Sequence, residues 1–192
     1  MPTNFGELFW RPVRLTPNKI AIEQGDLHLT YAQLEARTQR VASLLSARGI
    51  GKGDKVMLLL PNDYRFAEVL FGTVRTGAVA VPANIKLGMD ALAYIAEHSD
   101  STLLFTHADL TDKAAPLRDK GIFREIIMLN GGLNGTTDYE TALASAAPSF
   151  KTLDVDRNDT AMMMYTSGST GRPKGCLLSH ESKWFNADSN SK

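Results

Sequence analysis

The sequence predicts an α/β fold: a Rossmann-like, mostly parallel sheet flanked by helices, with a small β-hairpin near the N-terminus. Two observations support this prediction. Short apolar runs alternate with amphipathic segments over 55–129, which is typical of strands that are buried on both faces and joined by helices. The composition, with 43% hydrophobic and 22% charged residues in a chain of 192, is ordinary for a globular protein and excludes wholesale disorder.

The predicted hairpin pairs residues 19–22 with 27–29 around Gly25-Asp26, because glycine followed by aspartate suits a tight turn. A helix is predicted to follow. Thr30 and Gln33 have the spacing of a capping box, in which each side chain satisfies a free backbone N–H at the start of a helix. Apolar residues then recur at helical spacing, and Gly49 stands where the left-handed residue that ends a helix is expected.

Beyond this helix, each expected element is a short apolar run or an amphipathic segment. Strands are predicted at 55–60, 78–81, 102–105 and 125–129, and helices at 64–76, 89–97 and 110–120. Pro116 is expected to interrupt the last of these helices, since proline lacks the N–H that a helix interior needs.

The remainder of the chain contains one more helix, one more strand and the start of another helix. Thr137 to Glu140 fits a second capping box, opening a short helix that ends near 146. Residues 160–166 form an apolar strand whose three methionines, at 162–164, are expected to pack in the core. A further helix is expected to begin at 179–181, and His180 is interpreted as its start rather than as a residue near a nucleotide.

Charge and cysteine content exclude several classes of function. Lys+Arg and Asp+Glu both number 21, so no overall basic field favours nucleic acid, and anion binding must be local. The longest strictly apolar run, 56–60, is far too short for a membrane span, and the N-terminus does not resemble a signal peptide. The single cysteine, Cys176, excludes an internal disulfide and suits a reducing compartment. We therefore expect a cytoplasmic protein.

The isolated histidines and charged pairs are interpreted as structural or solvated. His28, His98 and His107 lack the spacing of metal ligands and are expected at the surface or in the hairpin, so no metal site is predicted. Glu35 and Arg37 are expected on a solvated helix face. Cys176 is interpreted as a small apolar strand residue, and Arg172 as a solvated charge at the tip of a loop.

One motif, at 165–175, carries chemistry: Tyr-Thr-Ser-Gly-Ser-Thr-Gly-Arg-Pro-Lys-Gly. Its glycines let backbone N–H groups converge on an anion. Its hydroxyl side chains add donors that rotate to fit phosphate oxygens, and Lys174 adds a positive charge. The motif differs from the usual P-loop of kinases and GTPases, because Pro173 precedes the lysine and Gly175 follows it. Phosphate binding is therefore favoured, with a loop that binds nothing as the alternative.

This motif resembles the phosphate-binding signature of the adenylate-forming superfamily, which includes acyl-CoA synthetases, firefly-luciferase-like enzymes and nonribosomal adenylation domains. Upstream segments are similar in kind and order, among them 29–34, 53–56, 60–62 and 77–84. The resemblance covers about 5–186. Pro82-Ala83-Asn84 is more similar to an acyl-CoA ligase than to a peptide-synthetase domain.

The resemblance implies a two-step reaction: ATP activates a carboxylic acid to acyl-AMP, and CoA then takes the acyl group. It also implies the small-molecule partners ATP, CoA and a carboxylic acid, and Mg²⁺ with ligands mostly outside this chain. Gly171 and Gly175 are expected to give the loop its backbone shape. The residues expected to bind the β- and γ-phosphates are Thr166, Ser167, Gly168, Ser169, Thr170, Gly171 and Lys174.

Family members are much longer than this chain. The resemblance therefore implies that 1–192 is the N-terminal fragment of an AMP-binding domain, and that the family's catalytic lysine lies beyond residue 192. No catalytic residue is expected within the chain. We expect no complete ligase activity from the chain alone, and either self-association or completion by C-terminal segments. Two alternatives stay open: a fragment of a nonribosomal-peptide-type adenylation domain, and a non-catalytic nucleotide-binding or assembly fragment.

Overall fold

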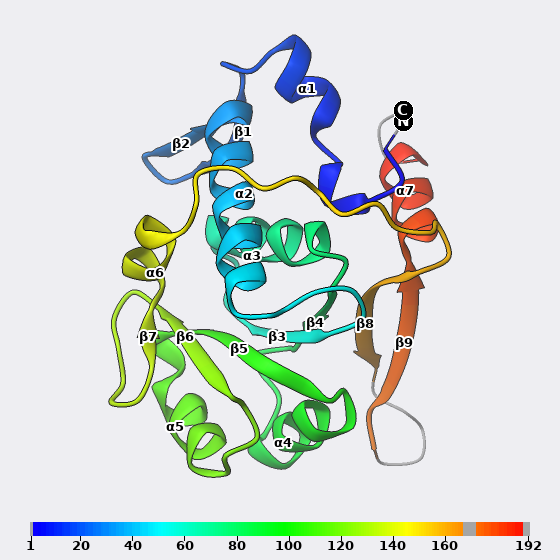
Figure 1. Ribbon diagram of the computed structural model, residues 1–192. Helices are drawn as coiled ribbons and strands as arrows, with labels where there is room; N and C mark the ends of the chain where they lie inside the picture. The colour runs from blue at the N-terminus through cyan, green and yellow to red at the C-terminus, as the bar shows by residue number, and fades with distance from the viewer. Residues whose placement is uncertain (1, 167–171, 190–192) are drawn as a thin grey trace.

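The computed structural model describes residues 2–166 and 172–189. In these residues a seven-stranded sheet runs in the order β7-β6-β5-β3-β4-β8-β9, and it is parallel apart from the last strand, β9 (Figure 1). The strands are β3 (Lys55–Leu59), β4 (Val79–Pro82), β5 (Ser101–His107), β6 (Glu125–Leu129), β7 (Thr137–Asp138), β8 (Thr160–Thr166) and β9 (Lys174–Ser179).

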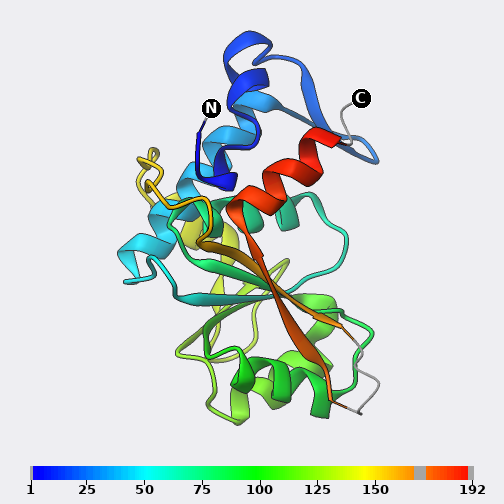
Figure 2. The same ribbon diagram turned by 90° about the vertical axis from the view of Figure 1, so that its right-hand side faces the viewer.

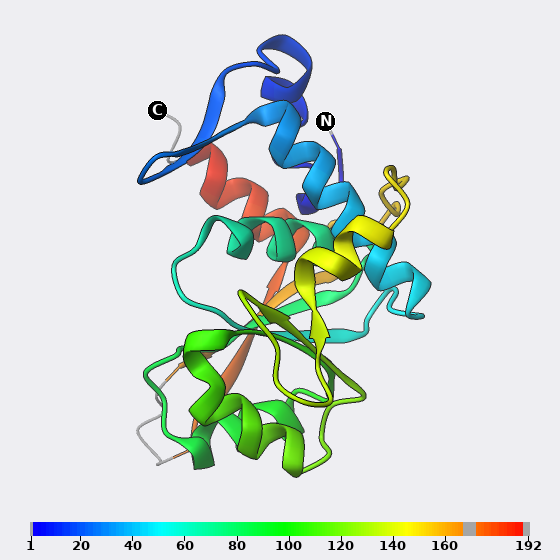
Figure 3. The same cartoon turned by 90° about the vertical axis from the view of Figure 1, so that its left-hand side faces the viewer.

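Helices cover both faces of this sheet (Figures 1 and 3). On one face lie α2 (Tyr31–Ala47), α3 (Tyr64–Arg75) and α6 (Tyr139–Ser145), and on the other lie α4 (Met89–His98) and α5 (Thr111–Asp119). The remaining elements are η1 (Phe5–Glu7), α1 (Trp10–Leu15), β1 (Ile20–Gln24), β2 (Leu27–Thr30), η2 (Ala108–Leu110) and α7 (His180–Ser189). The predicted α/β class is confirmed.

The central strand β3 shows why the apolar runs are continuous. Val56 and Leu58 pack toward α2 and α3, while Met57 and Leu59 pack toward α4, and all four side chains are fully buried. Successive side chains of a strand point to opposite faces, so a strand covered on both sides needs apolar residues at every position.

The N-terminal predictions are confirmed in detail. β1 and β2 pair antiparallel, and Gly25 in their turn has a φ of 59°. The Thr30 hydroxyl accepts a hydrogen bond from the Gln33 N–H at 3.2 Å, and the Gln33 side chain accepts one from the Thr30 N–H at 2.8 Å. Gly49 follows α2 with a φ of 71°, the left-handed conformation that favours glycine.

Two local predictions were wrong. Pro116 lies inside a continuous α5, because the buried side chains of Ala114 and Leu117 hold this helix against the sheet. Thr137 does not cap α6. Its hydroxyl instead donates to Glu125 at 2.9 Å as part of β7, and Asp138 is the N-cap, accepting from the Thr141 N–H at 2.8 Å.

The methionines of β8 are only partly in the core. Met162 is 5% exposed, Met163 is half-buried and Met164 is 42% exposed, so the expectation of core packing is wrong for Met164. β4 pairs with β8 only at Ala80 and Met162. Beyond this point Met163 and Tyr165 still pack against the core on the α4 side, whereas Met164 and Thr166, which point to the other face, are exposed.

The C-terminal helix is joined to the N-terminus through His180. As expected, His180 begins α7, but it is fully buried, and its Nδ1 accepts a hydrogen bond from the Phe5 N–H at 2.9 Å. The rings of Phe5 and Trp184 meet edge to face with centroids 6.1 Å apart. Burial lowers the pKa of His180 to about 4, so the imidazole is neutral at physiological pH.

This depressed pKa predicts a loss of stability in weak acid. In the unfolded chain His180 binds a proton near the ordinary histidine pKa of about 6.5, whereas in the folded chain it does so only near 4. The contribution of His180 to the free energy of unfolding is therefore fully present above pH 6.5 and is lost as the pH falls toward 4. We expect this residue to remove about 2 kcal/mol of unfolding free energy between pH 7.5 and 5. Urea denaturation of the wild type and of His180→Asn at both pH values measures the effect. Equal losses in the two proteins would contradict it.

Within the described ranges, no helix has the length and apolar character that crossing a bilayer requires.

Candidate phosphate-binding site

The predicted phosphate motif lies at the end of the antiparallel β8–β9 hairpin. β8 runs parallel to its neighbour β4, and β9 pairs with β8 antiparallel (Figure 2). In this register Thr166 is directly opposite Lys174. The first and last of the predicted phosphate-binding residues are therefore neighbours across the hairpin.

Thr166 and Lys174 are both exposed. The side chain of Lys174 forms no hydrogen bond or ion pair with any residue in the described ranges. Its ammonium group is thus available to an anionic ligand. The other predicted ligands, Ser167, Gly168, Ser169, Thr170 and Gly171, lie outside the described residues.

Gly175 has a steric role in the hairpin stem. A Cβ at this position would lie 3.3 Å from Cζ of Tyr165 and 3.4 Å from Cγ and Sδ of Met163. Glycine therefore lets these two side chains of β8 pass across β9. This crowding is a different reason for glycine from the backbone shape expected from the sequence.

Both ends of the loop contact α4. The Tyr165 hydroxyl and Nδ1 of His98 are hydrogen-bonded at 2.7 Å, and the Arg172 guanidinium lies 5.5 Å from the ring centroid of Tyr94. Arg172 is exposed, as expected for a charge near a loop tip, but it rests on an aromatic ring. His98 is exposed, which confirms its expected surface position.

A cavity of about 610 Å³ opens beside the stem, at the carboxyl ends of β3, β4 and β8. Its lining includes Asn62, Phe66, Asn84, Lys86 and Tyr165. Open α/β sheets bind ligands at the carboxyl ends of their strands. The hairpin thus lies next to the edge where this fold class places its chemistry.

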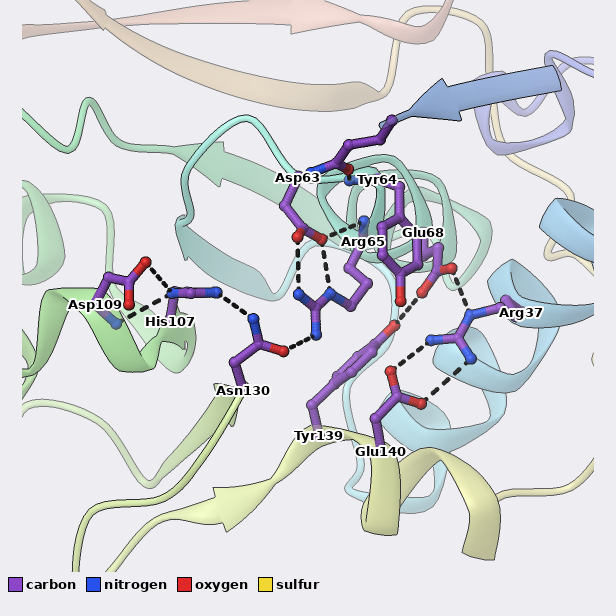
Figure 4. A network of polar contacts seen from close by, with 11 residues as sticks. Arg37, Asp63, Tyr64, Arg65, Glu68, His107, Asp109, Asn130, Tyr139 and Glu140 are labelled. Atoms are coloured by element: carbon purple, nitrogen blue, oxygen red, sulfur yellow. Dashed lines mark hydrogen bonds and ion pairs between the residues drawn. The ribbon is translucent and has the colours of Figure 1, made fainter. Parts of the chain in front are cut away.

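A polar network connects the carboxyl ends of β3, β5 and β6 at the same edge of the sheet (Figure 4). Asp63 accepts two hydrogen bonds from Arg65, at 2.7 and 2.8 Å. Arg65 donates to Asn130 at 2.6 Å, and Asn130 contacts Nε2 of His107 at 2.8 Å. Burial would raise the pKa of Asp63, but the Arg65 hydrogen bonds and charge hold it below its usual value.

A second part of the network joins α2, α3 and α6 (Figure 4). Arg37 donates to Glu68, and to Glu140 at 2.8 and 3.2 Å, while the buried Tyr139 hydroxyl donates to Glu68 at 2.8 Å. The Glu68 side chain is fully buried. This burial raises the pKa of Glu68, although the Arg37 guanidinium opposes the rise.

These networks correct two expectations. Glu35 and Arg37 are not solvated charges: Glu35 pairs with the buried Arg75, and Arg37 with Glu68. His107 is only 5% exposed, because it ends β5 inside the sheet edge and accepts a hydrogen bond from the Asp109 N–H at 3.1 Å.

The contacts of α4 with the loop were also missed from the sequence. The only available signal was position, since Tyr94 and His98 are four residues apart and therefore share one helix face. Among the described residues, no group of three or more His, Cys, Asp or Glu side chains is placed to hold a metal ion.

The chain is similar to several known proteins. Residues 9–190 match the family model described as AMP-binding enzyme. The feruloyl-CoA synthase of Amycolatopsis sp is 34% identical over 92% of this chain and 33% of its own length. The long-chain-fatty-acid–CoA ligase FadD13 of Mycobacterium tuberculosis is 37% identical over 82% of this chain and 31% of its own length.

Among solved structures, ATP-bound MatB from Rhodopseudomonas palustris superposes with a TM-score of 0.82 at 32% identity, covering 100% of this chain and 37% of MatB. The chain thus spans about a third of the length of the relatives it matches. The family match covers almost the whole sequence and includes the β8–β9 hairpin. The chain belongs to the AMP-binding enzyme family.

Proposed function

We propose that this chain supplies the triphosphate-binding loop of an acid–thiol ligase that uses ATP and CoA. A carboxylate oxygen of the acid attacks the α-phosphorus of ATP, the bond to the β-phosphate oxygen breaks, and pyrophosphate leaves. The thiol of CoA then attacks the acyl carbon of acyl-AMP, loses its proton and releases AMP. The similarity to CoA ligases supports this assignment.

The observation that carries the proposal is the placement of Thr166 opposite Lys174 at the carboxyl end of β8, where the Lys174 side chain has no partner among the described residues. A hydroxyl donor and an ammonium group on neighbouring residues stabilise the charge that builds up on departing pyrophosphate. We assign the loop 165–175 to the β- and γ-phosphates, with Ser167, Gly168, Ser169, Thr170 and Gly171 as the other ligands.

We further propose that residues 1–192 form the N-terminal part of the AMP-binding domain and that the protein is cytoplasmic, which the single cysteine supports. Mg²⁺ normally accompanies ATP and prefers carboxylate and carbonyl oxygens. No group of three or more His, Cys, Asp or Glu side chains in the described ranges is placed to hold it, and no step is assigned to this ion.

The test is an ATP titration of the ¹⁵N-labelled chain, followed by amide chemical shifts. We expect the resonances of residues 165–175 to move with saturable dependence on ATP, because their N–H groups meet phosphate oxygens. Adenosine, which lacks phosphates, is the control and should leave these resonances in place. If ATP shifts the amide resonances of other regions and leaves those of 165–175 unchanged, the assignment of the loop is wrong.

A further inference from the structure

One face of α4 meets both ends of the proposed phosphate-binding loop. Tyr94 and His98 lie one turn apart, with ring centroids separated by 5.1 Å. On the opposite side of the helix, Leu92, Ile95 and Ala96 are fully buried against the sheet. α4 is therefore a firmly packed element that presents two rings to the hairpin.

Each ring contacts a different end of the loop. His98 is hydrogen-bonded to Tyr165, the residue before Thr166, and the two rings meet edge to face at 5.8 Å. Tyr94 lies under Arg172, two residues before Lys174. Figure 2 shows the adjoining ends of β8 and β9 near α4.

The contact of Arg172 is with the ring rather than with acidic neighbours. Asp90 and Glu97 line the same cavity of about 500 Å³, yet within the described ranges neither forms an ion pair with Arg172. A guanidinium over an aromatic face is held by the quadrupole of the ring, which phenylalanine also possesses. Phenylalanine at position 94 is therefore expected to hold Arg172 as tyrosine does, whereas alanine is not.

We propose that Tyr94 and His98 are positioning residues for ATP. By holding Tyr165 and Arg172, they fix the two ends of the loop, so that Thr166 and Lys174 face one triphosphate without a further loss of conformational freedom on binding. This inference rests on the proposed function of the loop.

The test measures the ATP dissociation constant of the chain by the same titration. Tyr94→Ala is expected to weaken ATP binding about fivefold, because it removes one of the two contacts. Tyr94→Phe is expected to bind ATP as the wild type does, and Tyr165→Phe, which loses the hydrogen bond to His98, to bind about threefold more weakly. If Tyr94 had a purely structural role, Tyr94→Ala would lower the unfolding midpoint instead of the affinity for ATP.

A double-mutant cycle separates positioning from direct contact with phosphate. If Tyr94 acts through Arg172, then Arg172→Ala has little further effect in Tyr94→Ala. The Arg172 Nε–H resonance is expected to be shifted by the ring in the wild type and in Tyr94→Phe, and to lose this shift in Tyr94→Ala.

The outcomes distinguish the two proposals. If Tyr94→Ala binds ATP as tightly as the wild type while Lys174→Ala does not, the positioning role is wrong and the function of the loop stands. If the two alanine substitutions at 94 and 172 have fully additive effects, Arg172 acts independently and the inference also fails. If the wild-type chain itself does not bind ATP at 165–175, both proposals fail.

Discussion

Replacing Lys174 with alanine is expected to abolish most ATP-dependent chemistry while leaving the fold intact. The side chain of this lysine is exposed at the start of β9 and has no partner among the described residues, so its removal leaves no unpaired group in the described part of the chain. A charge near a phosphate contributes up to about 4 kcal/mol at an effective dielectric near 20, before screening by water. We expect ATP binding by the chain to weaken at least about tenfold.

Turnover is measured in a chimaera in which residues 1–192 replace the matching segment of FadD13. There Lys174→Ala is expected to lower ATP–pyrophosphate exchange about 10²–10³-fold, the range seen when one preorganised donor is removed from a developing anion. Lys151→Ala is the matched control, because it removes the same charge from another exposed position. A chimaera that keeps normal exchange without Lys174, with an unchanged unfolding midpoint, would disprove the assigned role.

The second large effect is on stability, for Glu68→Ala. This change removes the buried carboxylate that faces Arg37 and leaves the Tyr139 hydroxyl, which has no solvent exposure, without its acceptor. Removing one partner of a buried pair costs about 3–5 kcal/mol. Because Arg37 keeps its contact with Glu140, we expect the low end, about 3 kcal/mol, or a fall in Tm of about 6–12 °C.

Glu140→Ala is the matched control for this experiment. It removes the other carboxylate that pairs with Arg37, but the Glu140 side chain is 49% exposed. Exposed ion pairs contribute about 0–1 kcal/mol, so the unfolding midpoint in urea should hardly change. If the two variants lose equal stability, burial of Glu68 is not the source of the effect.

The order of the elements could be read from the sequence because its signals are local. The capping pair Thr30 and Gln33, the left-handed Gly49 and the continuous apolar run of β3 each depend on residues within a few positions. Local rules failed where a distant contact competes. Thr137 has the spacing of a cap, yet Glu125 on the neighbouring strand takes its hydroxyl.

The candidate site also has a part that local sequence signals predict and a part that they do not. The hydroxyl, glycine and lysine pattern at 165–175 predicts a phosphate loop, since the backbone shape and the donors needed for an anion lie within eleven consecutive positions. The supports of that loop could not be read, because Tyr94 and His98 are remote from it in the sequence and meet it only across the folded sheet.

By itself, the sequence determined the α/β class, the hairpin and the motif that carries the proposed chemistry. Only the tertiary structure decided that Glu68 and His107 are buried, that Arg37 pairs with Glu68, and that His180 joins α7 to the N-terminus. The physical reason is that a charged or polar side chain is buried only when a partner satisfies it. Those partners come from other elements of the fold, at separations such as 175 positions for His180 and Phe5, where no local pattern records them.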